Sequence, residues 1–158
     1  MVGPARINTD KPHQRKGSKS NAHAGAAFEL QIARYYAKQE IQVERDYVVP
    51  IGVGGTKKSH RFDLGSAESG YLVECKSHTW TEGNKVPSAK MAVWNQAMYY
   101  FHIAPKRYRK VLFVLKATSS SRRETLAEHY VRTYSHLIPP GVEIWEFNDR
   151  TREARRVH

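Results

Sequence analysis

Cysteine is nearly absent from this chain, and several other features that would narrow its function are missing. The single cysteine excludes an intrachain disulfide and a zinc site built from several cysteines. The eight histidines form no zinc-protease pattern such as HExxH. No apolar run approaches the roughly 18 residues of a membrane span, and the N-terminus lacks the apolar core of a secretion signal. We therefore expect an intracellular, cytoplasmic protein with no membrane partner.

Acidic residues are also scarce. The chain has 15 Asp and Glu against 26 Lys and Arg, which gives a formal net charge of +11 and a pI near 9.9. A charge this positive predicts a polyanionic partner, and nucleic acid is the commonest one in solution. On charge alone, a ribosome-binding or membrane-surface protein stays open.

Length and local composition predict one domain with two basic ends. A chain of 158 residues is large enough for a single core. Residues 1–20 carry five basic residues and one acidic residue, interrupted by proline and glycine. We expect them to form a flexible basic arm, which either contacts DNA or is an ordinary loose terminus. Residues 21–149 form the domain, and residues 150–158 form an arginine-rich tail that we expect to be frayed.

Hydrophobic periodicity predicts alternating helices and strands. The expected elements are a helix at 21–39, a strand at 41–49 ended by Pro50, a hairpin with strands at 62–64 and 71–76, a helix capped by Ser88, a strand at 111–115, a helix opened by a capping box at Ser121 and Glu124, and a strand at 142–147. The expected buried faces of the three helices are Phe28, Ile32 and Tyr35; Met91, Trp94, Met98 and Phe101; and Leu126, Tyr130, Tyr134 and Leu137. The uninterrupted apolar run at 111–115 predicts a strand that is buried on both faces and parallel to a neighbour.

The hairpin carries the residues of greatest chemical interest. Side chains alternate along a strand, so Glu74 and Lys76 share one face while Cys75 points to the other and is expected to be structural. A hairpin of this size brings Asp63 alongside Glu74. Two carboxylates suit Mg²⁺, with Mn²⁺ as a substitute, and a bound metal polarises a phosphate and activates water. An ordinary exposed hairpin with a Glu–Lys pair is the alternative.

The spacing of Asp63, Glu74 and Lys76 resembles the PD-(D/E)xK nuclease superfamily, although Phe62 replaces the proline common before the aspartate. The resemblance implies an α/β fold of α+β type. Its restriction-endonuclease-like αβββαβ core would have a mixed sheet flanked by helices, here with an appended C-terminal helix and strand. It implies that Asp63 and Glu74 are metal ligands and catalytic residues, and that Lys76 is catalytic.

Glu29 and Gln96 are added to the expected catalytic residues through the same resemblance. Glu29 follows Gly25-Ala-Ala-Phe28, which is similar to the first helix of junction resolvases of this superfamily, where a glutamate joins the active site. Gln96 and Tyr100 match the Gln-x-x-x-Tyr signature of its RecB-like exonucleases. An ordinary solvated glutamate and a plain helix surface are the respective alternatives.

Basic residues near these elements are the candidate DNA contacts, since Lys and Arg neutralise phosphates. The candidates are Lys57, Lys58 and Arg61 in a glycine-rich loop, Lys90 and Tyr100 on the second helix, and Lys106, Arg107, Arg109 and Lys110 in a dense patch.

Together these features predict a metal-dependent DNA endonuclease, and the small chain favours the restriction type. We expect it to act as a homodimer. A Holliday-junction resolvase, a DNA-repair exonuclease, a non-catalytic nucleic-acid-binding module and a structural protein are the alternatives.

Overall fold

The computed structural model describes residues 18–158 as an α+β protein with one six-stranded mixed sheet. The predicted N-terminal arm falls largely on residues 1–17 and so lies outside the described residues. The principal elements are α1 Ser18–Lys38, β1 Glu44–Ile51, β2 Lys58–Gly65, β3 Tyr71–Lys76, α2 Ser88–Ile103, β4 Arg109–Leu115, α3 Leu126–Tyr134, β5 Glu143–Phe147 and β6 Ala154–Arg156. None of the helices in this part of the chain is long and apolar enough to cross a membrane.

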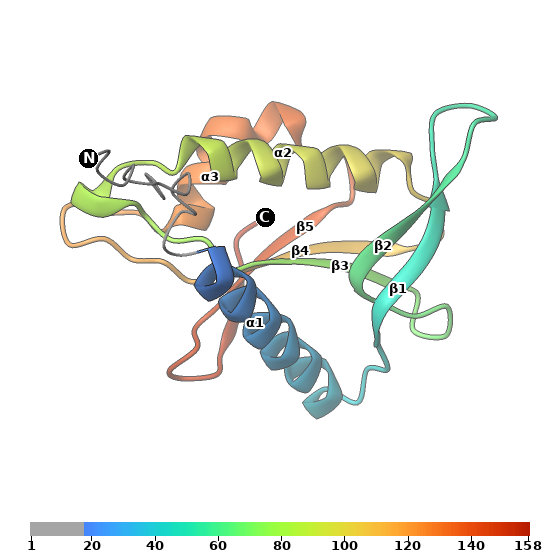
Figure 1. The fold of residues 1–158 in the computed structure, drawn as a ribbon, viewed down its shortest axis with the longest axis horizontal. Coiled ribbons are helices and arrows are strands. Elements are labelled where there is room, and N and C mark those ends of the chain that lie inside the picture. Colours follow the sequence, from blue (N-terminus) through green and yellow to red (C-terminus); the bar gives the residue numbers. More distant parts are fainter. Residues whose placement is uncertain (1–17) are drawn as a thin grey trace, which may run out of the picture.

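The strands lie in the sheet in the order in which they occur along the chain. β1, β2 and β3 pair antiparallel, whereas β4 is parallel to both β3 and β5, as the apolar run at 111–115 predicted. Helices α2 and α3 cover one face of the sheet and α1 covers the other (Figure 1). The predicted order of helix, three strands, helix and strand, followed by a further helix and strand, is confirmed.

Helix α1 closes one face because its apolar residues recur every four positions. Phe28, Ile32 and Tyr36 are buried against the sheet. Tyr36, rather than the predicted Tyr35, completes this stripe, and Tyr35 is only half-buried at its edge.

Helix α2 covers the opposite face with the residues that its periodicity predicted. Met91, Trp94, Met98 and Phe101 are all buried there. Strand β4 lies between the two layers. Its Leu112 belongs to the α2 side and its Phe113 to the α1 side, which explains why its sequence is apolar without alternation.

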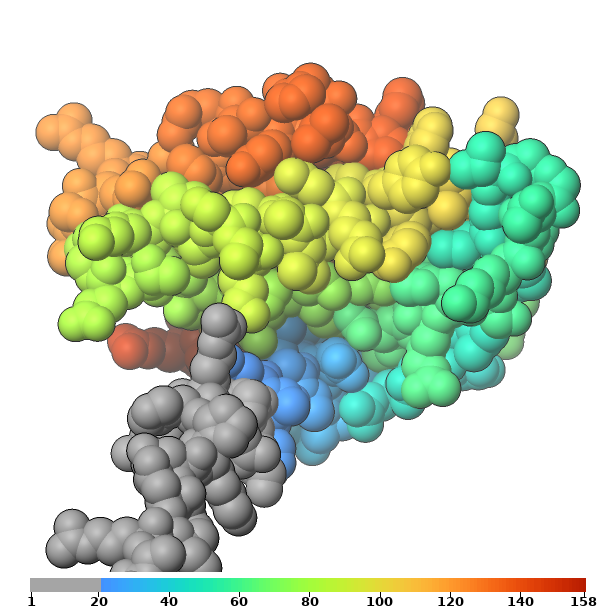
Figure 2. Space-filling view, turned by 45° about the horizontal axis from the view of Figure 1, so that its top comes forward, coloured from blue at the N-terminus to red at the C-terminus, as the bar shows by residue number. Residues whose placement is uncertain are grey.

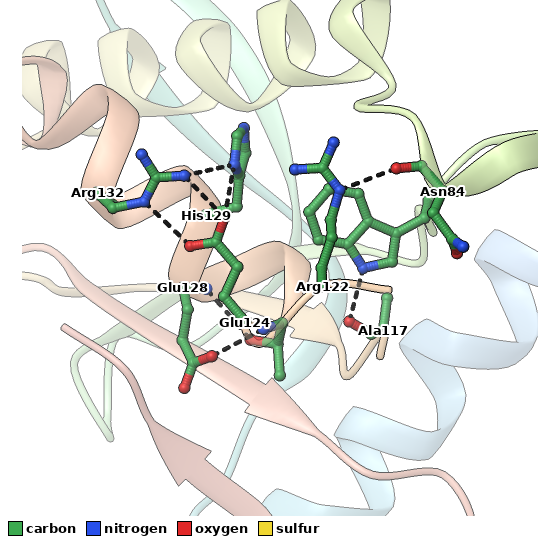
Figure 3. Close-up of polar contacts among 9 residues, drawn as sticks. Asn84, Ala117, Arg122, Glu124, Glu128, His129 and Arg132 are labelled. Carbon is green, nitrogen blue, oxygen red and sulfur yellow. Dashed lines mark hydrogen bonds and ion pairs between the residues drawn. The ribbon is translucent and has the colours of Figure 1, made fainter. Parts of the chain in front are cut away.

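Two predicted helix starts are wrong, one by one residue and the other by four. Pro87 occupies the N-cap position of α2 without a capping hydrogen bond, and Ser88, the predicted cap, is the first helical residue. Helix α3 begins after Thr125, whose side chain forms the capping box with Glu128; the predicted box at Ser121 and Glu124 does not form. Figure 3 shows Glu124 turned instead toward His129 and Arg132 of the helix.

Two elements also end elsewhere than expected: β1 runs further and α3 stops earlier. Strand β1 runs through Pro50, which a strand tolerates here because β1 is at the edge of the sheet. The helical turn after α3 leaves Leu137 41% exposed, so this residue does not face inward as predicted.

The C-terminal tail is not frayed as predicted, because residues 154–156 form strand β6 against β5. Arg155 is the residue that ties this strand down. Its guanidinium contacts the fully buried carboxylate of Glu146 at 2.6 Å and that of Glu128 at 2.7 Å. Burying an isolated carboxylate costs free energy, and the guanidinium of Arg155 offsets this cost for Glu146.

Replacing Arg155 with Ala should therefore lower the free energy of unfolding by about 2 kcal/mol, because it leaves the Glu146 carboxylate buried without its cation. Urea unfolding measures this change. Arg150→Ala, at an exposed arginine before β6, should change the free energy by less than about 0.5 kcal/mol. Equal effects of the two substitutions would contradict the assigned role of Arg155.

Candidate active site

The predicted carboxylates meet where β2 separates from β3. These strands pair directly at Leu64 and Val73 and at Gly65 and Leu72. At the neighbouring residue Asp63, the side chain replaces the backbone pairing. Its Oδ2 accepts a hydrogen bond from the backbone N–H of Cys75 at 2.7 Å. This bond holds the Asp63 carboxylate beside the β3 strand that carries Glu74.

The backbone changes face at Asp63. Strand alternation would put Phe62 and Leu64 on one side of the sheet, yet Phe62 packs under α2 and Leu64 packs against α1. Opposite this position in β1, Asp46 has a φ of 55°, and the pairing of β1 with β2 skips it. The local irregularity turns the aspartate toward the opening between the strands, half-buried between the two core layers.

Glu74 lies deeper than Asp63 and has two basic neighbours. Its side chain is only 8% exposed, and its Oε2 accepts a hydrogen bond from Lys76 Nζ at 2.8 Å. On its other side, His60 Nε2 lies 3.6 Å from Oε1, slightly too far for a hydrogen bond. Cys75 points away into the α1 side of the core, where burial raises the pKa of its thiol well above the ordinary value. The predicted sharing of one face by Glu74 and Lys76 is confirmed.

The charges of the two carboxylates interact, and the pKa values of Asp63 and Glu74 shift in opposite directions. Burial, together with the negative charge of Glu74, raises the pKa of Asp63 to about 7. Burial also raises the pKa of Glu74, but His60 and the ammonium of Lys76 outweigh it and hold that pKa below the ordinary value. For Lys76, burial lowers the pKa, but Glu74 and Asp63 more than compensate, so the side chain stays charged.

Protonation of Asp63 should make the stability of the metal-free protein pH-dependent. The folded state keeps this proton up to about pH 7, whereas a free aspartate loses it near 3.8. At Asp63 the folded state therefore binds more protons between these values, and this group alone should lower the free energy of unfolding by about 2 kcal/mol from pH 5 to pH 8. His78, whose pKa is lowered to about 4, contributes in the opposite direction over the lower part of this range, so the contribution of Asp63 is the difference between wild type and Asp63→Asn. The opposite contribution of Glu74, whose pKa is lowered, is complete below this window.

Urea unfolding in EDTA at several pH values measures that slope. Asp63→Asn should remove the Asp63 contribution, so that its stability rises relative to that of wild type by about 2 kcal/mol from pH 5 to pH 8, because the amide keeps the bond from Cys75 N–H without titrating. Glu68→Gln, at an exposed turn residue, should leave the slope unchanged. If wild type and Asp63→Asn show the same dependence of stability on pH, Asp63 is already ionised at pH 5.

Helix α1 supplies Glu29 on a third side of the site. Its carboxylate is close enough to contribute to the raised pKa of Asp63. Its Oε2 also lies 3.5 Å from the guanidinium of Arg45 in β1, a contact that sequence reasoning did not anticipate. The side chain is 26% exposed, so Glu29 borders the pair and remains accessible to solvent.

Helix α2 contributes Tyr100 and Gln96 to different extents. The ring of Tyr100 stacks on His60 with 4.1 Å between ring centroids, which connects it to Glu74 through the imidazole. Gln96 lies one turn earlier, is exposed, and makes no side-chain hydrogen bond within residues 18–158. The structure thus brings Tyr100 to the site and leaves Gln96 on the nearby helix surface.

Two hollows flank the carboxylates. A groove of about 680 Å³ is lined by Lys57, Lys58 and Arg61 together with His60 and Tyr100, and no acidic residue among those the structure describes lines it. The β1–β2 hairpin forms one wall at the C-terminal end of α2, where both are seen side by side in Figure 2.

A second cleft of about 600 Å³ contains Lys76, His78 and Lys90. His78 is an acceptor here, because its Nδ1 receives the indole N–H of Trp94 at 2.8 Å. Burial and the positive charges of Lys90 and Lys76 lower its pKa to about 4, so it is neutral near pH 7. Lys90 and Lys76 are then the cationic groups of this cleft.

The basic patch at 106–110 lies away from the carboxylates. Arg109 pairs with Tyr71 at the start of β3, five residues and about 16 Å before Lys76. Its guanidinium is held by Glu143 through two hydrogen bonds, while Lys110 donates to the backbone of Ala104. Lys106 and Arg107 remain exposed. The structure does not bring this patch together with the Asp63 and Glu74 pair.

A divalent metal would have Asp63 and Glu74 as its protein ligands. Among residues 18–158, no group of three or more His, Cys, Asp or Glu side chains could hold a metal ion. Mg²⁺ does not require one, because it is commonly bound by one or two carboxylates, with water and substrate phosphate completing the shell. Two neighbouring carboxylates, one of which has its pKa raised to about 7 by burial and by the charge of the other, gain from a cation that lets both groups ionise. The donor set therefore fits Mg²⁺.

No family model matches the chain, and neither a curated protein nor a solved structure matches it. The site itself combines two interacting carboxylates, a charged lysine and two flanking hollows, one lined by three cations and the other by Lys76, Lys90 and Glu82. This arrangement can hold a hard cation against a phosphate and place an ammonium beside it.

Proposed function

We propose that this protein is a Mg²⁺-dependent DNA endonuclease, of restriction type, with a restriction-endonuclease-like αβββαβ core of the PD-(D/E)xK kind. The observation that carries the proposal is the convergence of Asp63, Glu74 and Lys76 at the opening between β2 and β3. Buried charges are costly, and two neighbouring carboxylates that repel each other are hard to explain by folding alone.

In this proposal each residue has one role. Asp63 and Glu74 hold the metal, which supplies a polarised phosphate and an activated water when bound. Lys76, already 2.8 Å from Glu74, places its ammonium where negative charge builds on the phosphate. Glu29, on the open side, can orient water through its carboxylate.

DNA as the substrate is supported by charge and by shape. The chain carries a net charge of +11, and the groove beside His60 is lined by three cations and no acid. The grooves on either side of the carboxylates suit a duplex that lies across the site, rather than a strand threaded by its end. A break in both strands needs two such sites, so we propose a homodimer as the cutting unit.

A panel of three DNA substrates with Mg²⁺ tests the proposal. Closed circular plasmid, the same plasmid linearised, and a four-way junction should show nicks or discrete fragments from the circle. A strong preference for the junction would favour a resolvase, and degradation of the linear DNA alone would favour an exonuclease. Binding without cleavage of any substrate would refute the enzyme and leave a nucleic-acid-binding module.

A further inference from the structure

His60 has a buried nitrogen without a hydrogen-bond partner. Its Nε2 is inaccessible to solvent and makes no hydrogen bond within residues 18–158. Buried polar atoms are nearly always paired, so an exception calls for an explanation. The carboxylate of Glu74 is close by, with its Oε1 3.6 Å away.

The imidazole is fixed in this orientation by rings on two sides. Tyr100 of α2 stacks on it at 4.1 Å between centroids, and Phe62 meets it edge-on at 4.7 Å. Its backbone pairs with Val49 in the β1–β2 ladder. The ring therefore has little freedom to turn Nε2 away from Glu74.

The other histidine near the site provides a contrast. His78 has its Nδ1 satisfied by the indole of Trp94 at 2.8 Å, so its position is explained by packing and one hydrogen bond. His60 has no such bond at Nε2, although its ring is packed just as firmly. Packing alone accounts for His78 but not for the direction of the His60 ring.

One carboxylate oxygen of Glu74 accepts no hydrogen bond from the part of the chain that the structure describes. Lys76 occupies Oε2 at 2.8 Å, whereas Oε1 faces His60. A carboxylate that binds a metal is usually oriented by a hydrogen bond from a residue that does not itself bind the metal. The imidazole of His60 can supply this bond with a proton on Nε2, and a shift of about 0.6 Å would bring the atoms within range.

On the basis of the proposed function, we propose that His60 is a positioning residue that hydrogen-bonds Glu74 Oε1 in the metal-bound site, and that Tyr100 acts by holding the His60 ring. Tyr100 then contributes through its aromatic face, so its hydroxyl is dispensable. This role connects α2 to the metal site without any contact between Tyr100 and DNA.

Calorimetric titration with Ca²⁺ at pH 8 tests the proposal directly, because it needs no turnover. His60→Phe keeps an aromatic ring but removes the donor, and should weaken Ca²⁺ binding by about 10-fold or more. His60→Gln places an amide N–H near the position of Nε2 and should stay within about threefold of wild type. Tyr100→Phe should match wild type, and Tyr100→Leu should weaken binding as His60→Phe does. His102→Phe, on the exposed side of α2, is the matched control.

The same variants should separate metal affinity from maximum rate. The Mg²⁺ concentration for half-maximal plasmid cleavage should rise in His60→Phe by the same factor as the Ca²⁺ dissociation constant, and His60→Gln should reverse the rise. If His60→Phe does not fold, as judged by circular dichroism, the Tyr100 pair decides.

Three results would overturn the inference. His60→Phe binding Ca²⁺ as wild type does would overturn it alone, as would His60→Gln binding as weakly as His60→Phe. Wild-type protein that binds no Ca²⁺ would overturn it together with the proposed metal site.

Discussion

Replacing Asp63 with Asn, or Glu74 with Gln, should lower the rate of Mg²⁺-dependent plasmid cleavage by at least about 1,000-fold. Each substitution removes one of the two carboxylates that we propose as metal ligands. A bound metal is worth several kcal/mol to the transition state, and about 4 kcal/mol corresponds to a factor of 1,000. Single-turnover cleavage of closed plasmid at pH 8 measures the loss.

Controls distinguish loss of chemistry from loss of fold. Asp63→Asn keeps the hydrogen bond from the backbone of Cys75 and should remain folded. Glu68→Gln removes an exposed carboxylate on the turn between β2 and β3, and should cleave at the wild-type rate. If Asp63→Asn, folded and binding DNA, cuts within about threefold of wild type, Asp63 does not hold the catalytic metal.

Replacing Lys76 with Met should lower the single-turnover rate by about 100- to 1,000-fold, which is the usual loss when a preorganised group that stabilises developing charge is removed. The methionine keeps most of the buried stem but removes the ammonium that contacts Glu74. Binding of DNA in Ca²⁺ should weaken much less than the rate falls, because one cation among many contributes little to affinity.

Lys90→Met is the matched control, since Lys90 lines the same cleft from an exposed position on α2. It should reduce affinity for DNA modestly and leave the rate at saturating protein unchanged. If both lysine variants lose the same fraction of rate, Lys76 contributes only general positive charge.

The hairpin could be predicted from sequence because its signals are local. Alternation within 71–76 places Glu74 and Lys76 together, and the turn at 66–70 is short enough to set the register that brings Asp63 alongside. The buried stripe of α2 and the apolar strand β4 follow from periodicity in the same way. Each of these predictions depends on residues that are neighbours in the chain.

The errors arise where distant residues decide. The tail could not be recognised as a strand, because β6 depends on Arg155 reaching a buried Glu146 in β5 and Glu128 in α3. The sequence predicted that the basic residues at 106–110 are free to bind DNA. In the fold, Glu143 pairs with Arg109, and residues so far apart in the chain could not be matched from sequence. Pro50 marked the end of a strand in the sequence, but at the edge of a sheet its missing N–H costs little.

Within the site, the sequence suggested more residues than the structure collects. Asp63, Glu74, Lys76 and Glu29 lie together, whereas Gln96 remains on the helix surface. The main residue that sequence reasoning left without a role is His60. Strand alternation from Phe62 was the available signal, since both rings pack under α2.

The central claim is that the Asp63 and Glu74 pair cleaves DNA only with a metal of the right kind. The most direct measurement forms the complex of wild-type protein and closed circular plasmid in Ca²⁺, and then adds excess Mg²⁺ while the plasmid forms are followed over time. Mg²⁺ needs a compact octahedral shell, whereas Ca²⁺ is larger and more loosely coordinated. We expect the circle to stay closed in Ca²⁺ and to be nicked or cut after Mg²⁺ is added. A plasmid that stays bound and intact in both Mg²⁺ and Mn²⁺, or one that is cut equally well in EDTA, would contradict the account.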